Sequence, residues 1–201
     1  MSLLHENPKL IFQNIKELLS LAVTDRHHTF HTPVFTNKNQ NNSVQSRIVV
    51  LRKFDKDLLK LNFHTDFRSP KVNDLKNDSD SSFVFYDFKL KIQLRIKTHS
   101  IINHKNDLSK NIWGKAGLSS RKCYLSEKGP SSKTTLPEDG ISNHLKGVDP
   151  SKEESEKGYK NFTVIENEIK IIDWLYLASS GHRRLLINIK NSNPVFEWII
   201  P

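Results

Sequence analysis

Apolar residues at helical spacing mark the start of the chain. Asn7-Pro8 makes a suitable helix start, because proline fits the first turn of a helix. Apolar positions then recur three or four residues apart, at Leu10, Ile11, Ile15, Leu18, Leu19 and Ala22. We predict an amphipathic helix here, which covers the core as a lid.

The pattern changes to that of strands from about Thr29 onward. Residues 46–53, S-R-I-V-V-L-R-K, are rich in β-branched side chains, which predicts a strand buried along much of its length. Residues 59–64 are expected to form its hairpin partner. A short helix should follow Ser69, since serine is a good cap and Pro70 suits the first helical position.

Strands also dominate the rest of the chain. Residues 91–102 alternate apolar and polar side chains, so one face of that strand should belong to the core. Residues 107–125 have a helical pattern, and residues 126–160 have the composition of a long loop, either functional or disordered. Further strands are predicted at 83–88, 162–166, 169–177, 184–190 and 196–200. Many short strands with few helices indicate a barrel or a sandwich, formed by one domain over residues 1–201.

The composition is that of an ordinary globular protein, with 36% apolar and 26% charged residues. No segment approaches the roughly 18 consecutive apolar residues of a membrane span, and the N-terminal residues lack the pattern of a secretory signal. We therefore expect a soluble, cytoplasmic protein. Its single cysteine, Cys123, excludes an internal disulfide framework and a zinc finger.

A net charge of +9 favours an anionic partner, because positive potential attracts phosphates, nucleic acids and acidic surfaces. Lys and Asn are abundant throughout, a bias that often reflects genome composition, so nucleic acid is not the favoured partner. The phosphate of a small cofactor is the sharper interpretation.

Several common sites are absent from the sequence. The chain has no Gly-x-Gly-x-x-Gly or Walker loop, and only 7 glycines with which to build one. It also lacks His-x-x-x-His and His-Glu-x-x-His spacing on a helix. The adjacent His27 and His28 would point to opposite faces of a strand. We predict no metal site.

Cations, hydroxyls and a predicted helix start converge at residues 65–71. A phosphate monoester needs several donors, which Arg68, Ser69, Lys71 and the backbone amides of the helix start could supply together. The alternative is a capped helix with solvated cations. Composition alone leaves both interpretations open.

Five strings, taken in order, add a family resemblance. They are R-I-V-V-L-R at 47–52, F-H-T-D-F-R-S-P-K at 63–71, I-Q-L-R-I at 92–96, W-L-Y-L-A-S-S-G-H-R-R at 174–184 and E-W-I-I-P at 197–201. Their order and spacing over most of residues 30–201 resemble the pyridoxamine 5′-phosphate oxidase family and its related FMN-binding proteins. The resemblance implies a mainly β (α+β) fold with flanking helices, the FMN-binding split β-barrel, and a homodimer that holds FMN at the subunit interface.

The resemblance also implies which residues hold the cofactor. The residues expected to contact FMN are Arg47, Ile48, Val49, Val50, Leu51, Arg52, His64, Thr65, Arg68, Ser69, Lys71, Gln93, Trp174 and Arg184. Trp174 and Arg184 would come from the partner subunit. Arg52 replaces the family's usual lysine, and Arg68 would supply the guanidinium that is missing at Pro70. Donors beside the flavin ring stabilise the negative charge that develops on reduction.

Departures from the family pattern concern the substrate. His182 keeps a histidine position that in the oxidases handles the substrate, so it is the candidate catalytic residue, but Ser180 replaces an arginine. The oxidases' grip on the substrate phosphate has no clear counterpart; the residues available for it are Ser119, Ser120, Arg121 and Tyr124. Ser131 and Ser132 correspond to a pair that contacts the flavin.

The sequence thus favours an FMN-dependent oxidoreductase that acts on an unidentified small molecule. Two alternatives stay open. One is a non-catalytic protein that binds or senses flavin, which the serine at position 180 favours. The other is a basic nucleic-acid-binding barrel without flavin, whose binding would weaken steeply with salt.

Overall fold

The computed structural model describes residues 3–191 and 193–201. Over these residues nine strands form one antiparallel sheet in the order β2-β1-β5-β6-β7-β4-β3, and β8 pairs with both β7 and β9. The strands are β1 (Val34–Lys38), β2 (Val44–Ile48), β3 (Lys53–Asp55), β4 (Lys60–Asp66), β5 (Asp80–Asp87), β6 (Ile92–Asn103), β7 (Phe162–Tyr176), β8 (Arg183–Lys190) and β9 (Asn193–Ile199). The predicted mainly β class with flanking helices is confirmed.

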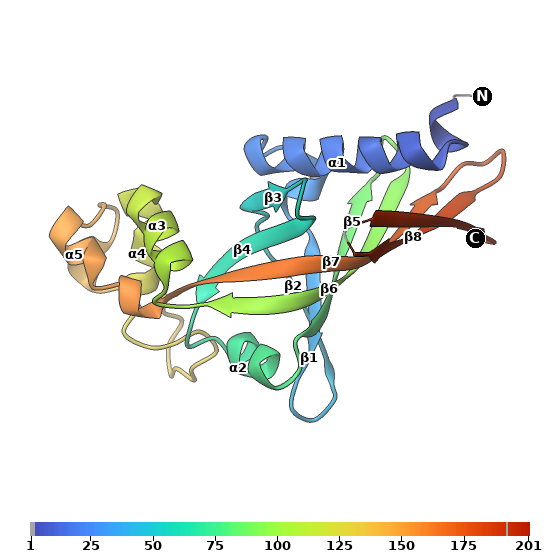
Figure 1. Ribbon diagram of the computed structural model, residues 1–201. Helices are drawn as coiled ribbons and strands as arrows, with labels where there is room; N and C mark the ends of the chain where they lie inside the picture. Colours follow the sequence, from blue (N-terminus) through green and yellow to red (C-terminus); the bar gives the residue numbers. More distant parts are fainter. Residues whose placement is uncertain (1–2, 192) are drawn as a thin grey trace.

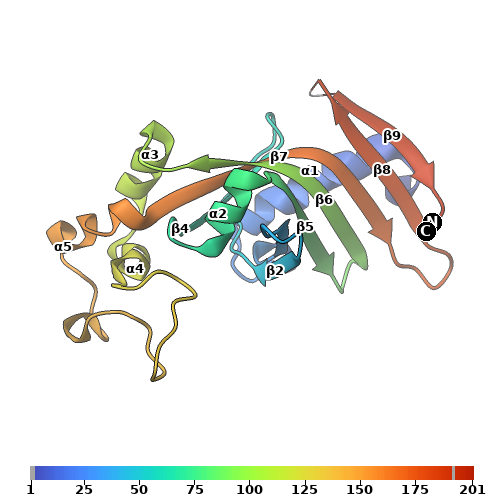
Figure 2. The same cartoon turned by 90° about the horizontal axis from the view of Figure 1, so that it is seen from below.

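Helices lie on both sides of the sheet and at one end (Figures 1 and 2). The α-helices are α1 (Pro8–Thr24), α2 (Pro70–Asn77), α3 (Asp107–Lys115), α4 (Leu118–Lys122) and α5 (Lys152–Glu156). Single 3₁₀ turns are η1 (Leu3–His5), η2 (Thr29–His31), η3 (Cys123–Leu125), η4 (Asn143–Leu145) and η5 (Tyr159–Asn161). None of the helices in the described ranges is long and apolar enough to span a membrane.

The predicted N-terminal helix is α1, and its first turn is capped as expected. The side chain of Asn7 accepts hydrogen bonds from the backbone N–H groups of Lys9 and Leu10, and Pro8 opens the helix. The buried face consists of Ile11, Phe12, Ile15, Leu18, Leu19 and Ala22. Leu10, expected on that face, is exposed instead. The apolar face packs against the sheet, so α1 closes one side of the core (Figure 1).

Phenylalanines fill the centre of the core. The ring of Phe35 lies 4.8 Å from that of Phe63 and 5.1 Å from that of Phe83, centroid to centroid. These side chains come from β1 and β5, which are neighbours in the sheet, and from β4, which β6 and β7 separate from β5, so the core spans the curved sheet. Burying such rings stabilises each by about 2–3 kcal/mol relative to exposure to water.

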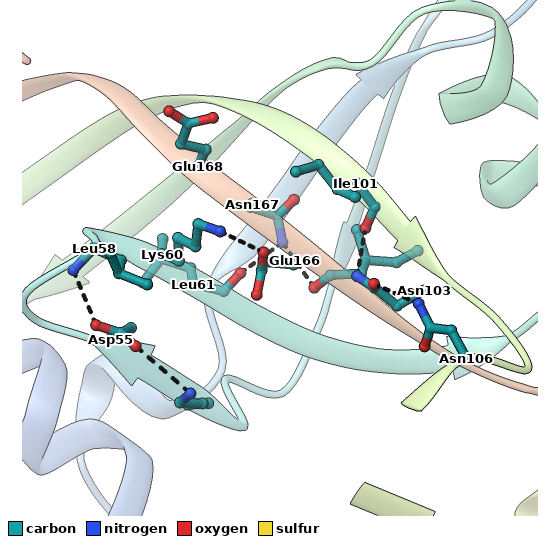
Figure 3. Close-up of polar contacts among 12 residues, drawn as sticks. Asp55, Leu58, Lys60, Leu61, Ile101, Asn103, Asn106, Glu166, Asn167 and Glu168 are labelled. Atoms are coloured by element: carbon teal, nitrogen blue, oxygen red, sulfur yellow. Dashed lines mark hydrogen bonds and ion pairs between the residues drawn. The ribbon is translucent and has the colours of Figure 1, made fainter. Parts of the chain in front are cut away.

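A buried asparagine fixes the pairing of β4, β7 and β6. Asn167 donates from Nδ2 to the carbonyl oxygen of Leu61 at 2.9 Å, and its Oδ1 accepts from Ser100 Oγ at 2.7 Å. On the opposite face Lys60 and Glu166 form an ion pair at 2.7 Å (Figure 3). Because an unpaired amide would be costly inside the sheet, these contacts select one register.

The prediction of one buried strand at 46–53 is wrong. β2 ends at Ile48 on the edge of the sheet, where it pairs with β1, and Ile48 is 60% exposed. The chain then crosses over: Leu51 turns into the core, and β3 forms the hairpin with β4. The run of β-branched residues covers two different environments, and their composition does not show where the pairing changes.

Residues 107–125 form two helices and a turn rather than one helix, because the chain breaks at Ala116-Gly117. Residues 126–160 also differ from a plain loop, since η4, α5 and part of η5 lie within them. These segments form a lobe at one end of β6 and β7 (Figure 1). Its centre is Trp113, which packs with Phe162 and Val164. The two strands expected at 162–166 and 169–177 are one strand, β7.

Candidate functional site

Lys71 lies at the centre of a polar cluster where β4 ends and α2 begins. Its Nζ donates hydrogen bonds to Thr65 Oγ1 at 2.9 Å and to Ser69 Oγ at 2.7 Å. Ser69 is the N-cap residue of α2, but its side chain makes no capping bond, so the hydroxyl is available to Lys71. Pro70 occupies the first turn, as predicted. The structure thus brings three of the predicted residues together.

Arg47 reaches the same place from β2. Its guanidinium donates to Asn37 Oδ1 and lies 5.7 Å from the ring centre of Phe35. Burial lowers the pKa of Arg47, opposed by the charge of Asp74. Burial, and after it the charge of Arg47, lowers the pKa of Lys71 to about 8. The two cations therefore lie near enough to disfavour each other's charge.

These side chains line a pocket of about 460 Å³. Its lining residues are Asn39, Gln45, Arg47, Ser69, Pro70, Lys71, Asp74, Pro130 and Ser131. Within the described part of the chain neither Arg47 nor Lys71 forms an ion pair. Asp74, the carboxylate in the wall, accepts a hydrogen bond from Asn37 at 3.4 Å. Partly buried cations that form no ion pair, next to a helix start, suit a phosphate.

Arg68 has other partners. Its Nε and Nη2 donate to the two carboxylate oxygens of Asp66 at 3.0 and 2.7 Å. Further bonds go to the carbonyl oxygens of Ser126 and Glu127. Arg68 does not line the pocket, so the structure does not favour the phosphate contact predicted for this guanidinium.

The predicted pair His64 and Thr65 is divided between the two faces of β4, because neighbouring residues of a strand point in opposite directions. The ring of His64 lies edge-on against Phe162 at 5.1 Å, on the side of the lobe. Burial, and then the charge of Arg52, lowers the pKa of His64 to about 4. The imidazole is therefore neutral at neutral pH.

The predicted residues of the 48–52 segment are spread over several environments. Ile48 is exposed on the sheet face opposite Arg47, and the side chain of Leu51 is buried in the core with 1% exposure. Val49 and Val50 are half-buried after the end of β2, and Arg52 is exposed. The segment does not form one continuous lining.

A second group of predicted residues lies in a row across β6, β7 and β8. Gln93 is paired with Leu175, and Leu175 with Arg184, so the glutamine and the arginine project from one face two strands apart. Asp173 holds Arg184 by bonds of 3.0 and 2.9 Å to Nε and Nη2. The same carboxylate binds Arg95.

Trp174 belongs to the opposite face of this row. It is 1% exposed and lies in the aromatic stack of His5 and Tyr176. In one protomer its indole is therefore a core side chain and is not grouped with Gln93 and Arg184.

The two groups lie far apart in one chain. Thr65, beside Lys71, is paired with Thr163 of β7, whereas Gln93 is paired with Leu175 of the same strand. Twelve residues of strand separate these positions, a path of roughly 40 Å. A single protomer does not bring its predicted flavin contacts into one site.

The predicted substrate residues are also dispersed. His182 and Ser180 are exposed in the turn between β7 and β8. Arg121 is 4% exposed in the lobe, where it binds Glu156, Ser155 and the carbonyl oxygen of Trp113. No free guanidinium remains in the described segment 118–124.

The sequence did not identify three polar residues that shape these groups: Asn37, Asp66 and Asp173. Asp173 alternates with apolar residues as an exposed strand position does, and Asn37 stands between the polar residues Thr36 and Lys38, so only the structure shows that each contacts an arginine. Asp66 stands two residues before Arg68, and this spacing was the one signal in the sequence that could have indicated their ion pair.

Residues 13–103 match the sequence model of the pyridoxamine 5′-phosphate oxidase FMN-binding domain. The predicted resemblance to this family is confirmed over these residues. FMN is the cofactor of that domain, and the match includes Arg47, Ser69, Lys71 and Gln93. Trp174, His182 and Arg184 lie outside it. No curated protein sequence matches this chain.

Solved structures support the same fold over nearly the whole chain. An FMN-binding protein related to pyridoxamine 5′-phosphate oxidase from Nostoc punctiforme PCC 73102 is 18% identical, with a TM-score of 0.74 and coverage of 94% of this chain and 96% of its own. PhzG from Burkholderia lata 383, in complex with tetrahydrophenazine-1-carboxylic acid, is 13% identical, with a TM-score of 0.74 and coverage of 100% and 98%. A general stress protein 26 relative from Clostridium acetobutylicum is 11% identical, with a TM-score of 0.53 and coverage of 96% and 97%. At these identities the likeness establishes the split-barrel fold.

Proposed function

We propose that this chain holds the phosphate of FMN in the pocket of Arg47, Ser69 and Lys71, and acts as a flavin-dependent oxidoreductase on a small molecule. The observation that carries the proposal is the pair of partly buried cations that, among the described residues, have no ion-pair partner. A phosphate monoester supplies the missing charge and accepts from both cations, from the Ser69 hydroxyl and from the start of α2. The family match over the same residues supports it.

Two copies of the chain are needed if Arg184 meets the same flavin as Lys71, because the two residues lie at opposite ends of the sheet. We therefore propose a homodimer. Support comes from the face that carries Gln93 and Arg184, which also exposes Val44, Ile48 and Tyr86. When bound, FMN would supply electron transfer at its ring, and Gln93 and Arg184 would donate hydrogen bonds to that ring.

The substrate we propose is a small organic molecule without a phosphate group. Arg121 is already bound to Glu156, and position 180 is a serine, so neither position offers a free guanidinium to the phosphate of a vitamin B6 substrate. PhzG, of the same fold, binds a carboxylic acid. Organic acids are therefore a sensible first class to screen.

The second candidate is a flavin-binding protein without catalysis. It is favoured by the exposure of His182 in a turn that, in one protomer, is remote from the pocket. An enzyme would reduce or reoxidise its bound flavin faster when its organic substrate is added. A non-catalytic protein would show the same rates of flavin reduction and reoxidation with and without the added molecule.

The first experiment is an absorbance spectrum of the purified protein after incubation with FMN and removal of the free cofactor. We expect flavin bands that correspond to about one FMN per chain. Lys71→Ala should retain much less flavin, whereas Lys110→Ala, which removes an exposed lysine of α3, should retain as much as the wild type. A wild-type protein without flavin bands would remove the proposal and favour the flavin-free, basic binding protein.

A further inference from the structure

Arg68 connects the phosphate pocket to the chain segment that follows α4. It stands directly before Ser69, the N-cap of α2. Its Nη2 donates to the carbonyl oxygen of Ser126 at 3.0 Å, and its Nη1 to that of Glu127 at 3.1 Å. One side chain therefore ties the helix start to a segment almost sixty residues further along the chain.

The guanidinium is held firmly from the other side. Asp66, buried at the end of β4, accepts from the backbone N–H of Arg68 at 2.8 Å as well as from its Nε and Nη2. Arg68 thus makes a two-pronged contact with a carboxylate and still has donors for two carbonyl groups. Only a planar guanidinium offers that set of donors; a lysine ammonium would lose the fork.

The tied segment continues into the wall of the pocket. A Cβ atom on Gly129 would come within 3.0 Å of the Cβ of Arg68, so the loop lies directly on the arginine stem. The next two residues, Pro130 and Ser131, line the pocket together with Arg47 and Lys71. In Figure 2 the yellow stretch after α4 extends toward α2 before it returns to the lobe.

We propose that Arg68 is a positioning residue, which holds residues 126–131 as a cover over the phosphate pocket and thereby slows release of the bound cofactor. This inference rests on the proposed function, because the cofactor's phosphate must occupy that pocket. It assigns Arg68 a role other than phosphate contact. Bound to Asp66, Arg68 leaves Arg47 and Lys71 as the cations that face the pocket.

Limited proteolysis of the flavin-free protein tests the contact itself. Trypsin cleaves after Lys128 and Lys133, which follow the two tied carbonyl groups. In Arg68→Lys we expect cleavage there to be about tenfold faster than in the wild type, because the carbonyl bonds are weakened. Arg26→Lys, a change at an exposed arginine after α1, is the matched control and should not alter the rate.

The FMN dissociation rate, measured by fluorescence after dilution, tests the effect on the cofactor. Arg68→Lys should raise that rate about tenfold while the association rate and the melting temperature of the flavin-free protein stay near the wild-type values. Gly129→Val, which pushes the loop away from the other side of the contact, should change dissociation in the same direction.

Each result has a distinct meaning. Cleavage of Arg68→Lys and of Gly129→Val at the wild-type rate would contradict the contact between Arg68 and residues 126–129. A looser loop with unchanged FMN release would overturn the cover role and leave the proposed function intact. A wild-type protein that takes up no FMN would overturn the proposed function and, with it, the claim about cofactor release.

Discussion

The two ends of the sheet carry arginines and lysines in opposite states of pairing. Where β2, β4 and α2 meet, Arg47 and Lys71 face one pocket and, among the described residues, have no ion-pair partner. Twelve residues along β7, Arg95 and Arg184 share the carboxylate of Asp173. The two groups of cations therefore differ in whether a protein carboxylate already balances their charge.

The paired arginines have their geometry fixed, and the single carboxylate that they share neutralises about half of their combined charge. They can direct hydrogen bonds, but they attract an anion less strongly than two cations without an ion-pair partner would. The unpaired cations repel each other and have lost part of their hydration, which is unfavourable until an anion arrives. The contrast assigns phosphate binding to the unpaired cations, Arg47 and Lys71, and orientation of a neutral group, such as a flavin ring, to the paired arginines.

Removing one unpaired cation should have the largest effect on binding. Lys71→Gln eliminates a charge-assisted hydrogen bond to the phosphate, so we expect FMN affinity to fall by about 1.5–3 kcal/mol. Quenching of flavin fluorescence in an equilibrium titration measures this change. Lys110→Gln on α3 serves as the control, and an affinity equal to that of the wild type in Lys71→Gln would contradict the assignment.

Asn167 lies on β7 between the two ends, and its removal should affect folding rather than affinity. Asn167→Ala leaves the carbonyl oxygen of Leu61 and the hydroxyl of Ser100 without this partner. We expect a loss of about 1–3 kcal/mol in the free energy of unfolding, measured by urea denaturation. A variant as stable as the wild type would show that the asparagine does not fix the register.

The pH dependence should distinguish the two ends. The pKa of Lys71 lies near 8 in the folded, flavin-free protein, below its ordinary value of 10.5, because of burial and the charge of Arg47. FMN affinity should therefore decrease as the pH rises above about 8, by up to about tenfold per pH unit. Lys71→Gln should remove this dependence. A pH-independent affinity in the wild type would argue against a titrating lysine in the pocket.

The lowered pKa of Lys71 affects the stability of the flavin-free protein in the opposite direction from its effect on FMN affinity. Between pH 8 and 10.5 the unfolded chain binds more protons at Lys71 than the folded chain does. The contribution of this residue therefore makes the flavin-free protein more stable as the pH rises through that window. Urea denaturation of the wild type and of Lys71→Gln at several pH values measures this contribution of Lys71 to the free energy of unfolding.

The smallest effect is expected from the paired end. Asp173→Asn weakens the support of Arg95 and Arg184 without removing either cation. Because the two arginines remain partly in contact with water, we expect a change below about 1 kcal/mol in stability and in FMN affinity. Calorimetry and the flavin titration measure both. An effect as large as that of Lys71→Gln would mean that the two ends do not differ as described.

The starts of α1 and α2 and the buried face of β6 could be predicted because their signals are local. Asn7-Pro8 and Ser69-Pro70 each mark a helix start within a few residues, and alternation along β6 shows which face is buried. The change of partner after Ile48 could not be predicted, because β-branched residues suit both an edge strand and a segment that enters the core. Pairing depends on contacts distant in sequence.

In the candidate site, too, contacts between residues close in sequence could be predicted and contacts between distant residues could not. Thr65, Ser69 and Lys71 lie within seven residues, so their contact could be expected from the sequence, and the family resemblance added Arg47. The positions of Asp173 beside Arg184 and of the 126–131 segment on Arg68 could not be predicted. They arise from the register of β7 with β8 and from a loop that returns across the fold.

The most direct test of the phosphate assignment compares FMN with riboflavin, which differs from it only by the phosphate group. Equilibrium titrations with both ligands should be made on the wild type and on Lys71→Gln. The account predicts that the wild type prefers FMN by about 10- to 100-fold and that the variant loses most of this preference. Equal affinities of the wild type for the two flavins would contradict it, because the pocket of Arg47 and Lys71 would then contribute nothing to cofactor binding.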